Sequence, residues 1–386
     1  MKRILVVFHD SHRYSGASAS MLDLIDSMLL NNNDFTIEVL LPNKNGSIIR
    51  ELDKRKIKIY YSRYYSCRYL IKSNTSNVLF RYFKSFVKMS VSLVSAYLFS
   101  RKNRNFDYIY SNTTDIYFGL FLNAFLKKKH ICHMREFGVK DQNANQVIGN
   151  GLFYNTLYRK SDAIVVISKA LKDFLLSQVN DSQDKIFTVY DDLSLDKNFN
   201  DFNHEFKSIS ILIVGTISIG KGQEFIIDCL GQLKSEGIDI NLGIAGNDDN
   251  DYAQYLKEKV KRLGLKDNVV FLGFRTDISD LRKQYNTAVV ASKSEAFGRV
   301  TIEAMNAKQL VLVNDSGANS ELVSDGNTGF VFKAEDNESF AQTIRRILSF
   351  SESEILDMTN RAYIESESFS SGRAGKTIGN IINELE

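Results

Sequence analysis

Residues 288–305 have the sequence AVVASKSEAFGRVTIEAM, beginning at Ala288 and ending at Met305. The four apolar residues at the start predict a buried strand of a parallel sheet. The apolar residues Ile302 and Met305 predict a helix, and Gly298 marks a tight turn before it. The first amides of a helix have no partners within the helix, so this order of strand, turn and helix favours a phosphate in front of the turn.

Two carboxylates flank that turn, Glu295 before it and Glu303 inside the expected helix. A carboxylate accepts hydrogen bonds from hydroxyl groups well and has no reason to approach a phosphate. If one carboxylate accepts hydrogen bonds from a sugar and the other from a ribose, the two acids belong to a pocket for a nucleotide sugar. The alternative is a helix with acidic residues near its start, which suit the helix dipole. The strand and turn around the two acids favour the pocket.

The string EAFGRVTIEAM, from Glu295 to Met305, resembles the acidic donor-binding motif of family-4 retaining glycosyltransferases. These enzymes have the GT-B fold, an α/β architecture of two doubly wound Rossmann-like domains facing across a cleft. The resemblance implies retention of anomeric configuration, with no metal ion or other cofactor. It implies that Glu295 holds hydroxyls of the donor sugar and that Glu303 holds the ribose. Backbone amides of four residues would hold the sugar and the phosphates: Phe297, Gly298, Arg299 and Val300.

The length and the order of expected elements also indicate two α/β domains. The chain has 386 residues, of which 44% are hydrophobic. A chain of this length is too long for one ordinary core. Strands alternate with helices in both halves, which predicts parallel sheets with right-handed crossovers. We expect an acceptor-side domain over residues 1–200 and a nucleotide-sugar domain over 201–365, with a charged linker around 191–207. By the resemblance, a helix in 366–386 crosses back to the first domain.

A glycine-rich loop, VGTISIGKGQ, occupies residues 214–223, directly after the first expected strand of the second domain. Such a loop ending in Lys221 can approach and neutralise phosphate, although a simple turn with a solvated lysine is the alternative. The loop resembles a family motif in which an Arg usually stands at the position of Thr216. Lys221, assisted by Arg299 and helix amides, would therefore have to stabilise the leaving group.

Three further positions are donor-site candidates by resemblance. Gly16, in the string SGAS after the first strand, matches a glycine loop that closes over the donor phosphate. His133 ends a strand at the edge where ligands of such folds bind, and the family places a sugar-contacting His there. A lone histidine at a strand end is nevertheless more often structural. The main chain around Phe274 would hold the base. The expected catalytic residues are His133, Lys221 and Glu295.

The charge distribution is uneven. From Lys54 to Arg104 there are 13 Lys or Arg residues and no Asp or Glu, which leaves 36 of the 49 basic side chains against all 46 acidic ones elsewhere. In an expected helix at 78–100, Arg81, Lys84 and Lys88 share one stripe and apolar residues fall near the opposite one. Several tyrosines precede it (Tyr60, Tyr61, Tyr64, Tyr65 and Tyr69). This composition suits an anionic membrane surface. The alternative is a helix packing its apolar face on its own sheet with the lysines solvated, and both interpretations can hold at once. Nucleic acid is disfavoured because the remaining chain is acidic.

Compartment and activity follow from these features. The cysteines, Cys67, Cys132 and Cys229, are widely spaced and are expected to be reduced thiols. The first apolar run is too short for a secretory signal. We therefore expect a cytoplasmic enzyme, peripheral at the inner face of the cell membrane, that transfers a sugar from a nucleotide diphosphate donor, UDP favoured, to a lipid-linked glycan or polysaccharide precursor. Nucleotide-sugar epimerase, glycoside hydrolase and inactive partner subunit remain as alternatives.

Overall fold

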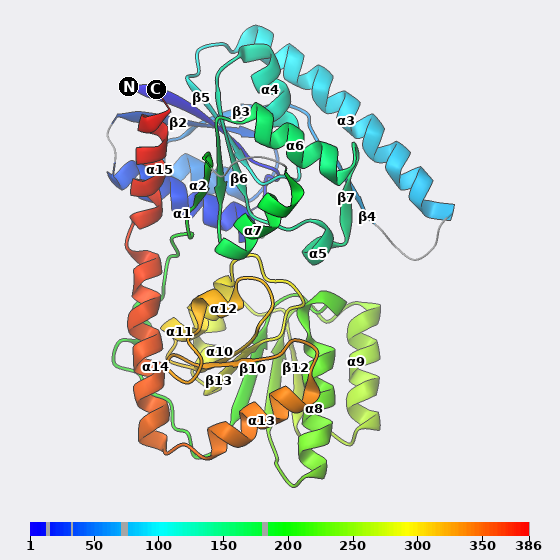
Figure 1. Ribbon diagram of the computed structural model, residues 1–386, viewed down its shortest axis with the longest axis vertical. Coiled ribbons are helices and arrows are strands. Elements are labelled where there is room, and N and C mark those ends of the chain that lie inside the picture. Colours follow the sequence, from blue (N-terminus) through cyan, green and yellow to red (C-terminus); the bar gives the residue numbers. More distant parts are fainter. Residues whose placement is uncertain (13–15, 32–33, 71–75, 180–183, 386) are drawn as a thin grey trace. The chain divides into compact units, whose positions relative to one another are not determined.

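The computed structural model describes residues 1–12, 16–31, 34–70, 76–179 and 184–385. The chain divides into two compact units, Met1–Leu193 with Gly372–Glu386, and Ser194–Ser371 (Figure 1). The expected boundaries after residues 200 and 365 lie a few residues from these. Among the described residues, no helix combines the length and the apolar character needed to cross a bilayer.

The first unit contains a parallel sheet of seven strands in the order β3-β2-β1-β5-β6-β8-β9. Its strands are β1 Lys2–Val7, β2 Phe35–Leu41, β3 Lys58–Tyr61, β5 Tyr108–Asn112, β6 Lys129–Met134, β8 Ala163–Val166 and β9 Ile186–Thr188. Two short antiparallel strands, β4 Arg68–Leu70 and β7 Ala144–Gln146, pair apart from it. The helices are α1 Gly16–Asn31, α2 Ile48–Lys54, α3 Ser76–Lys102, α4 Phe118–Leu126, α5 Val139–Gln142, α6 Asn150–Lys160, α7 Lys169–Gln178 and α15 Arg373–Glu384.

Alternate residues of β1 enter the cores on the two faces of this sheet, as the two-residue period of a strand requires. Ile4 and Val6 pack with side chains of α1 and α15, whereas Leu5 and Val7 pack with side chains of α3 and α4. Both faces are therefore covered by helices, which explains why the strands are apolar without a polar side.

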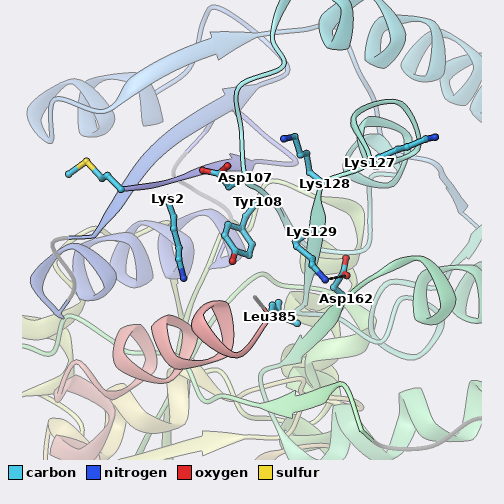
Figure 2. Close-up of a pocket in the computed structure, with 9 residues that line it drawn as sticks. Lys2, Asp107, Tyr108, Lys127, Lys128, Lys129, Asp162 and Leu385 are labelled. Atoms are coloured by element: carbon cyan, nitrogen blue, oxygen red, sulfur yellow. Dashed lines mark ion pairs between the residues drawn. The ribbon is translucent and has the colours of Figure 1, made fainter.

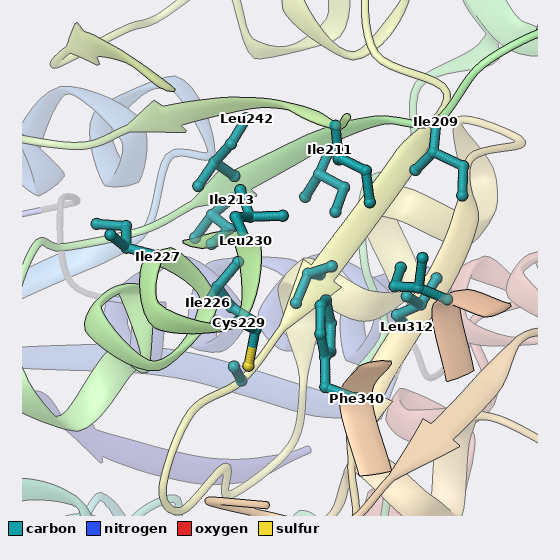
Figure 3. Close-up of a cluster of buried hydrophobic side chains, with 14 of the residues drawn as sticks. Ile209, Ile211, Ile213, Ile226, Ile227, Cys229, Leu230, Leu242, Leu312 and Phe340 are labelled. Atoms are coloured by element: carbon teal, nitrogen blue, oxygen red, sulfur yellow. The ribbon is translucent and has the colours of Figure 1, made fainter. Parts of the chain in front are cut away.

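The second unit contains a parallel sheet of six strands in the order β12-β11-β10-β13-β14-β15. Its strands are β10 Ser210–Val214, β11 Asn241–Ala245, β12 Val269–Gly273, β13 Thr287–Val290, β14 Leu310–Asn314 and β15 Phe330–Phe332. Its helices are α8 Gln223–Ser235, α9 Asp251–Arg262, α10 Ile278–Arg282, α11 Arg299–Asn306, α12 Asn319–Leu322, α13 Asn337–Leu348 and α14 Glu352–Glu367. Side chains of β10, α8 and α13 form its main core (Figure 3).

The C-terminal helix α15 belongs to the first unit and packs on α1. The Gly375 amide donates to Ser27 Oγ at 2.9 Å, and a Cβ at Gly375 would lie 2.3 Å from the Ser27 backbone. The Asp192 carboxylate accepts from Ser27 Oγ at 2.8 Å and from the Ala374 amide at 3.0 Å. Asp192 is buried, so the first residues of the expected linker at 191–207 are part of the first unit and anchor the start of α15.

Candidate functional site

The loops at the carboxyl ends of β10, β13 and β14 are held together by their backbones. The Lys293 amide donates to the Gly220 carbonyl at 2.9 Å, and the Ala318 amide donates to the Glu295 carbonyl at 2.8 Å. These bonds join the glycine-rich loop, the turn before α11 and the loop after β14 into one surface. This edge is where parallel α/β sheets bind ligands.

Glycines make that close approach possible. Gly222 has a φ of 75°, and a Cβ there would lie 2.1 Å from the Ala291 carbonyl oxygen. Gly317 has a φ of 62°, and a Cβ there would lie 2.2 Å from the Glu295 carbonyl oxygen. No other residue type satisfies both the positive φ and the contact distance. The expected tight turn at Gly298 is confirmed, with a φ of 92° at the cap of α11.

Lys221 and Glu295, predicted separately from two motifs, lie together at this edge. Lys221 Nζ is 3.2 Å from Glu295 Oε2, and the two side chains are 41% and 20% exposed. Gly222 caps α8 and Gly298 caps α11, and neither has a side chain to bond the amides of the first helical turn. The arrangement therefore offers an ammonium group, a carboxylate and two helix N-termini to a ligand, which suits an anion joined to a hydroxyl-bearing group.

Glu303 is held by two arginines, one of which the sequence did not indicate. Its carboxylate is 3.1 Å from Arg299 Nε and 3.5 Å from Arg282 Nη2. Arg282 is 3% exposed, and its Nη1 donates to Gln309 Oε1 at 2.7 Å. Burial lowers the pKa of the Arg282 guanidinium. In the sequence Arg282 is one charged residue at the end of a short amphipathic segment. No pattern there distinguishes a buried arginine from one exposed to solvent on a helix.

A cavity of about 680 Å³ opens beside the glycine-rich loop. It is lined by Val214, Gly215, Thr216, Ala245, Gly246, Asn247, Phe274, Arg275 and Ile278. Phe274 is 69% exposed, so its ring is available for stacking. Thr216 is exposed and its carbonyl accepts from Gln223 Nε2 at 3.0 Å. The cation that an Arg would bring at position 216 is absent from this wall.

The remaining motif residues differ in what they expose. Phe297 is 5% exposed and its ring contacts Phe369, which leaves its backbone rather than its side chain to serve a ligand. Val300 is half-buried and its carbonyl accepts from Arg282 Nη2 at 3.4 Å. Arg299 is engaged with Glu303. Lys221 is also ion-paired, but its side chain is 41% exposed against 28% for Arg299, so Lys221 is the better placed of the two to meet a diphosphate.

In the first unit, His133 lies at the carboxyl edge of the sheet in a buried polar cluster. Its Nδ1 accepts from Arg135 Nη2 at 3.2 Å and is 2.9 Å from the Tyr110 hydroxyl. Arg135 also pairs with Asp191. Burial, with a contribution from Arg135, holds the pKa of His133 well below its usual range. Because Arg135 can only donate, the neutral ring carries its proton on Nε2, which is buried without a partner among the described residues.

Gly16 begins α1, and Ser15, which precedes it in the predicted loop, lies outside the described residues. A Cβ at Gly16 would meet nothing within 4 Å among the described residues. Space does not therefore demand a glycine at this position. The nearby Ala17 carbonyl accepts from Asn112 Nδ2 at 3.1 Å, which connects the start of α1 to β5.

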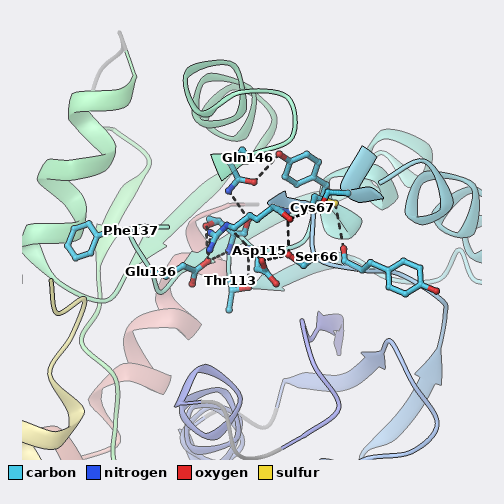
Figure 4. A network of polar contacts seen from close by, with 12 residues as sticks. Ser66, Cys67, Thr113, Asp115, Glu136, Phe137 and Gln146 are labelled. Carbon is cyan, nitrogen blue, oxygen red and sulfur yellow. Dashed lines mark hydrogen bonds and ion pairs between the residues drawn. The ribbon is translucent and has the colours of Figure 1, made fainter. Parts of the chain in front are cut away.

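A second buried network, around Glu136, is structural. One Glu136 oxygen accepts from Arg68 Nη2, from the Thr114 amide and from the Thr114 hydroxyl, each at 2.8 Å (Figure 4). Asp115 accepts from Ser66 Oγ at 2.5 Å. These bonds fix β4 against the ends of β5 and β6, and all the charges are paired within the network, so it explains packing rather than ligand binding.

A cavity of about 670 Å³ lies at the opposite, amino-terminal edge of the first sheet, among Lys2, Tyr108 and Lys129 (Figure 2). Lys129 Nζ is 3.2 Å from Asp162 Oδ1. Since parallel sheets present ligand sites at their carboxyl edge, this cavity is not part of the candidate site.

Comparisons with known proteins agree with this geometry. Residues 195–363 match the glycosyl transferases group 1 family. An uncharacterized glycosyltransferase of Methanocaldococcus jannaschii is 30% identical over 205 residues, which are 49% of this chain and 52% of the relative. The lipopolysaccharide core biosynthesis mannosyltransferase LpcC of Rhizobium leguminosarum is 31% identical over 134 residues, 35% of this chain and 38% of the relative. The chain thus spans about half or less of the length of these curated relatives.

Solved structures resemble the whole chain. The Anabaena protein HepE in complex with UDP and glucose has a TM-score of 0.75 at 18% identity, with 100% of both chains covered. The lipopolysaccharide outer core galactosyltransferase WaaB has a TM-score of 0.75 at 14% identity, again with 100% of both chains covered. The fold is therefore the expected GT-B architecture of two Rossmann-like parallel sheets with helices.

Proposed function

We propose that this chain, whose residues 195–363 match the glycosyl transferases group 1 family, is a retaining glycosyltransferase that uses a nucleotide diphosphate sugar. The observation that carries the proposal is the Lys221–Glu295 ion pair between the glycine-capped starts of α8 and α11. A glycoside hydrolase would have no use for this anion-binding surface. A transferase needs it because negative charge develops on the departing diphosphate.

Lys221 and the helix amides would stabilise that charge. Lys221 is paired with Glu295 at 3.2 Å. A diphosphate would compete for the ammonium group and leave the Glu295 carboxylate to accept hydroxyls of the donor sugar. Because Thr216 supplies no cation, Lys221 would carry more of the stabilisation than in relatives with an Arg there. We propose that the reaction runs without a metal ion or other cofactor.

Glu303 and the cavity beside Phe274 would hold the nucleoside. Arg282 and Arg299 pair with the Glu303 carboxylate and orient it, which suits an acceptor for two ribose hydroxyls. The exposed Phe274 ring would contact the base, and UDP is favoured because HepE has been solved with UDP and glucose. His133 would donate its Nε2 proton to a sugar hydroxyl, since this buried group has no other partner among the described residues.

The proposed acceptor is a hydroxyl of a lipid-linked glycan or a polysaccharide precursor, and the proposed location is peripheral at the inner face of the cell membrane. Support comes from the relatives, among which LpcC is a lipopolysaccharide core biosynthesis mannosyltransferase. One further candidate function has an observation in its favour. Thr216 leaves a single lysine at the phosphate site, which would also fit an inactive partner subunit of another transferase.

Calorimetric titration with UDP, GDP and ADP tests the donor assignment. Release of the nucleoside diphosphate from the matching sugar donors is then measured with and without acceptor. We expect one nucleoside diphosphate to bind and its release to require an acceptor. Binding without release under all acceptors would favour the inactive subunit. Release of an epimerised sugar nucleotide would favour the epimerase. Absence of binding to any nucleotide would refute the proposal.

A further inference from the structure

The long helix α3 packs on the first unit through small side chains. Ser85, Ser92 and Ala96 are buried, and they share one side of the helix by their spacing of seven and four residues. Ser85 Oγ donates to the Arg68 carbonyl at 2.9 Å, and Ser92 Oγ accepts from the Tyr65 amide at 3.1 Å. The packed face of α3 is thus made of serine and alanine, with Phe99 added near its end.

The opposite face, which we call the outer face of α3, consists of large apolar side chains in contact with solvent. Nine of them are between 37% and 78% exposed: Leu79, Phe80, Phe83, Phe86, Val87, Val91, Val94, Tyr97 and Leu98. The usual amphipathic helix of a globular protein does the reverse and buries its apolar stripe. The alternative that this stripe packs on its own sheet is therefore wrong. Contiguous exposed apolar surface of this kind marks an interaction site.

The charges beside the outer face indicate which partner covers it. Lys84 and Lys88 lie along one flank, at positions between the outer and the packed faces, and Lys88 Nζ lies over the Tyr65 ring. No acidic residue occurs from Lys54 to Arg104. A second copy of the chain would bring lysines opposite lysines in a symmetric contact. An anionic bilayer offers both an apolar interior and negative headgroups.

We propose that α3 lies in the plane of an anionic lipid bilayer, with its outer face among the acyl chains and Lys84 and Lys88 at the headgroup phosphates. The serine bonds fix the helix along the unit, so only the outer face can enter the lipid. Insertion of the aromatic and aliphatic side chains, rather than a basic stripe alone, accounts for the exposed residues. This inference rests on the peripheral membrane location proposed above and adds to it the surface that binds the membrane.

The basic stripe and the tyrosines predicted from the sequence contribute less than expected. Arg81 turns toward the body of the unit, where its Nη1 is 3.5 Å from the Leu70 carbonyl. Tyr64 is 2% exposed and its hydroxyl donates to the Phe8 carbonyl, so it cannot reach lipid. The outer face is instead extended by Phe125 of α4, whose ring contacts Tyr97.

Vesicle sedimentation of the full chain tests the proposal without donor or acceptor, so its failure is separate from a failure of the transferase proposal. We expect binding to vesicles of phosphatidylglycerol and phosphatidylcholine. The F83S/F86S variant should bind about 30-fold more weakly or worse, because two phenylalanines no longer enter the apolar phase. The matched control L348S/I364S changes two exposed apolar residues of the second unit and should bind as the parent does.

Insertion can also be observed directly because the chain contains no tryptophan. In F83W, the single indole emission should shift to shorter wavelength on vesicle binding and be quenched by lipids brominated on their acyl chains. The I364W control should show neither change. K84Q/K88Q should weaken binding to anionic vesicles and leave the weaker binding to pure phosphatidylcholine unchanged.

Three results would overturn the proposal. One is F83S/F86S sedimenting as the parent does while circular dichroism shows both folded. Another is an F83W emission that vesicles do not change. The third is a parent chain that does not bind vesicles but forms dimers, together with an F83S/F86S variant that is monomeric. The outer face would then be a contact between two copies of the chain. Calorimetric binding of a nucleotide by F83S/F86S reports separately on the donor site.

Discussion

Replacing Lys221 by Gln separates a role at the reaction centre from a role in the fold. Lys221 Nζ lies 3.2 Å from Glu295 Oε2, with the side chains 41% and 20% exposed. Ion pairs as accessible as this contribute about 0–1 kcal/mol to stability. The K221Q variant should therefore unfold with a free energy within about 1 kcal/mol of the parent.

The effect on transfer should be much larger. One unit of negative charge develops on the departing diphosphate as its bond to the sugar breaks, and Lys221 is the cation placed between the two helix N-termini. Losing one such preorganised group costs about 2–4 kcal/mol of transition-state stabilisation, which is about a 30- to 1,000-fold fall in kcat/KM. The fall in kcat/KM is measured as release of the nucleoside diphosphate at a subsaturating concentration of the donor. The unfolding free energy is measured by chemical denaturation.

The matched control is R345Q, because Arg345 is 39% exposed and pairs with Glu236 at 2.6 Å elsewhere in the same unit. This variant should retain the parental kcat/KM. If K221Q turns over donor within about threefold of the parent, or if R345Q loses as much activity as K221Q, the placement of Lys221 at the diphosphate is refuted.

Three further predictions concern the fold, the pH dependence and metal ions. G222A should destabilise the second unit by about 2 kcal/mol or more, since its Cβ would lie 2.1 Å from the Ala291 oxygen at a φ of 75°; G220A, with open space in the same loop, is the denaturation control, and equal stability of the two variants would contradict the contact. Burial lowers the pKa of His130 to about 4, whereas in the unfolded chain it titrates near its ordinary value, so the contribution of His130 to the unfolding free energy should be complete above about pH 6.5 and fall by about 3 kcal/mol toward pH 4. H130Q should flatten that slope, and an unchanged slope would exclude His130 as its source. Transfer should survive excess EDTA; this test is needed because Asp249 and Asp251 at the start of α9 have the Asp-x-Asp spacing of metal-dependent transferases, and loss restored by Mn²⁺ would show that a metal is required.

Except for the three-residue edge strands β9 and β15, the strands of both sheets were predictable because parallel strands covered on both faces are continuous apolar runs. The run at 288–291 corresponds to β13, Thr287–Val290, and the helix after Gly298 is α11. The pair β4 and β7 was not predictable. Each has three residues, and Arg68 pairs with Gln146 across more than seventy positions of the chain, which no local pattern encodes.

The contacts between side chains are the second feature that could not be predicted from the sequence. The motifs identified Glu303 and Lys221, but not Arg282, whose importance comes from burial and from its contact with Glu303. The periodicity of 78–100 gave the helix α3 and its apolar stripe, but periodicity cannot say which stripe faces the protein. In α3 the small residues do, because Ser85 and Ser92 bond the backbone beside β4.

The most direct test of retaining transfer from a nucleotide diphosphate sugar is an NMR measurement of the product's anomeric configuration, made on the full chain with the donor and acceptor that support turnover. We predict a new glycosidic signal with the same anomeric configuration as the donor, appearing in step with nucleoside diphosphate release and slowed in K221Q. A product of inverted configuration, or free sugar released without a new glycosidic bond, would contradict the account.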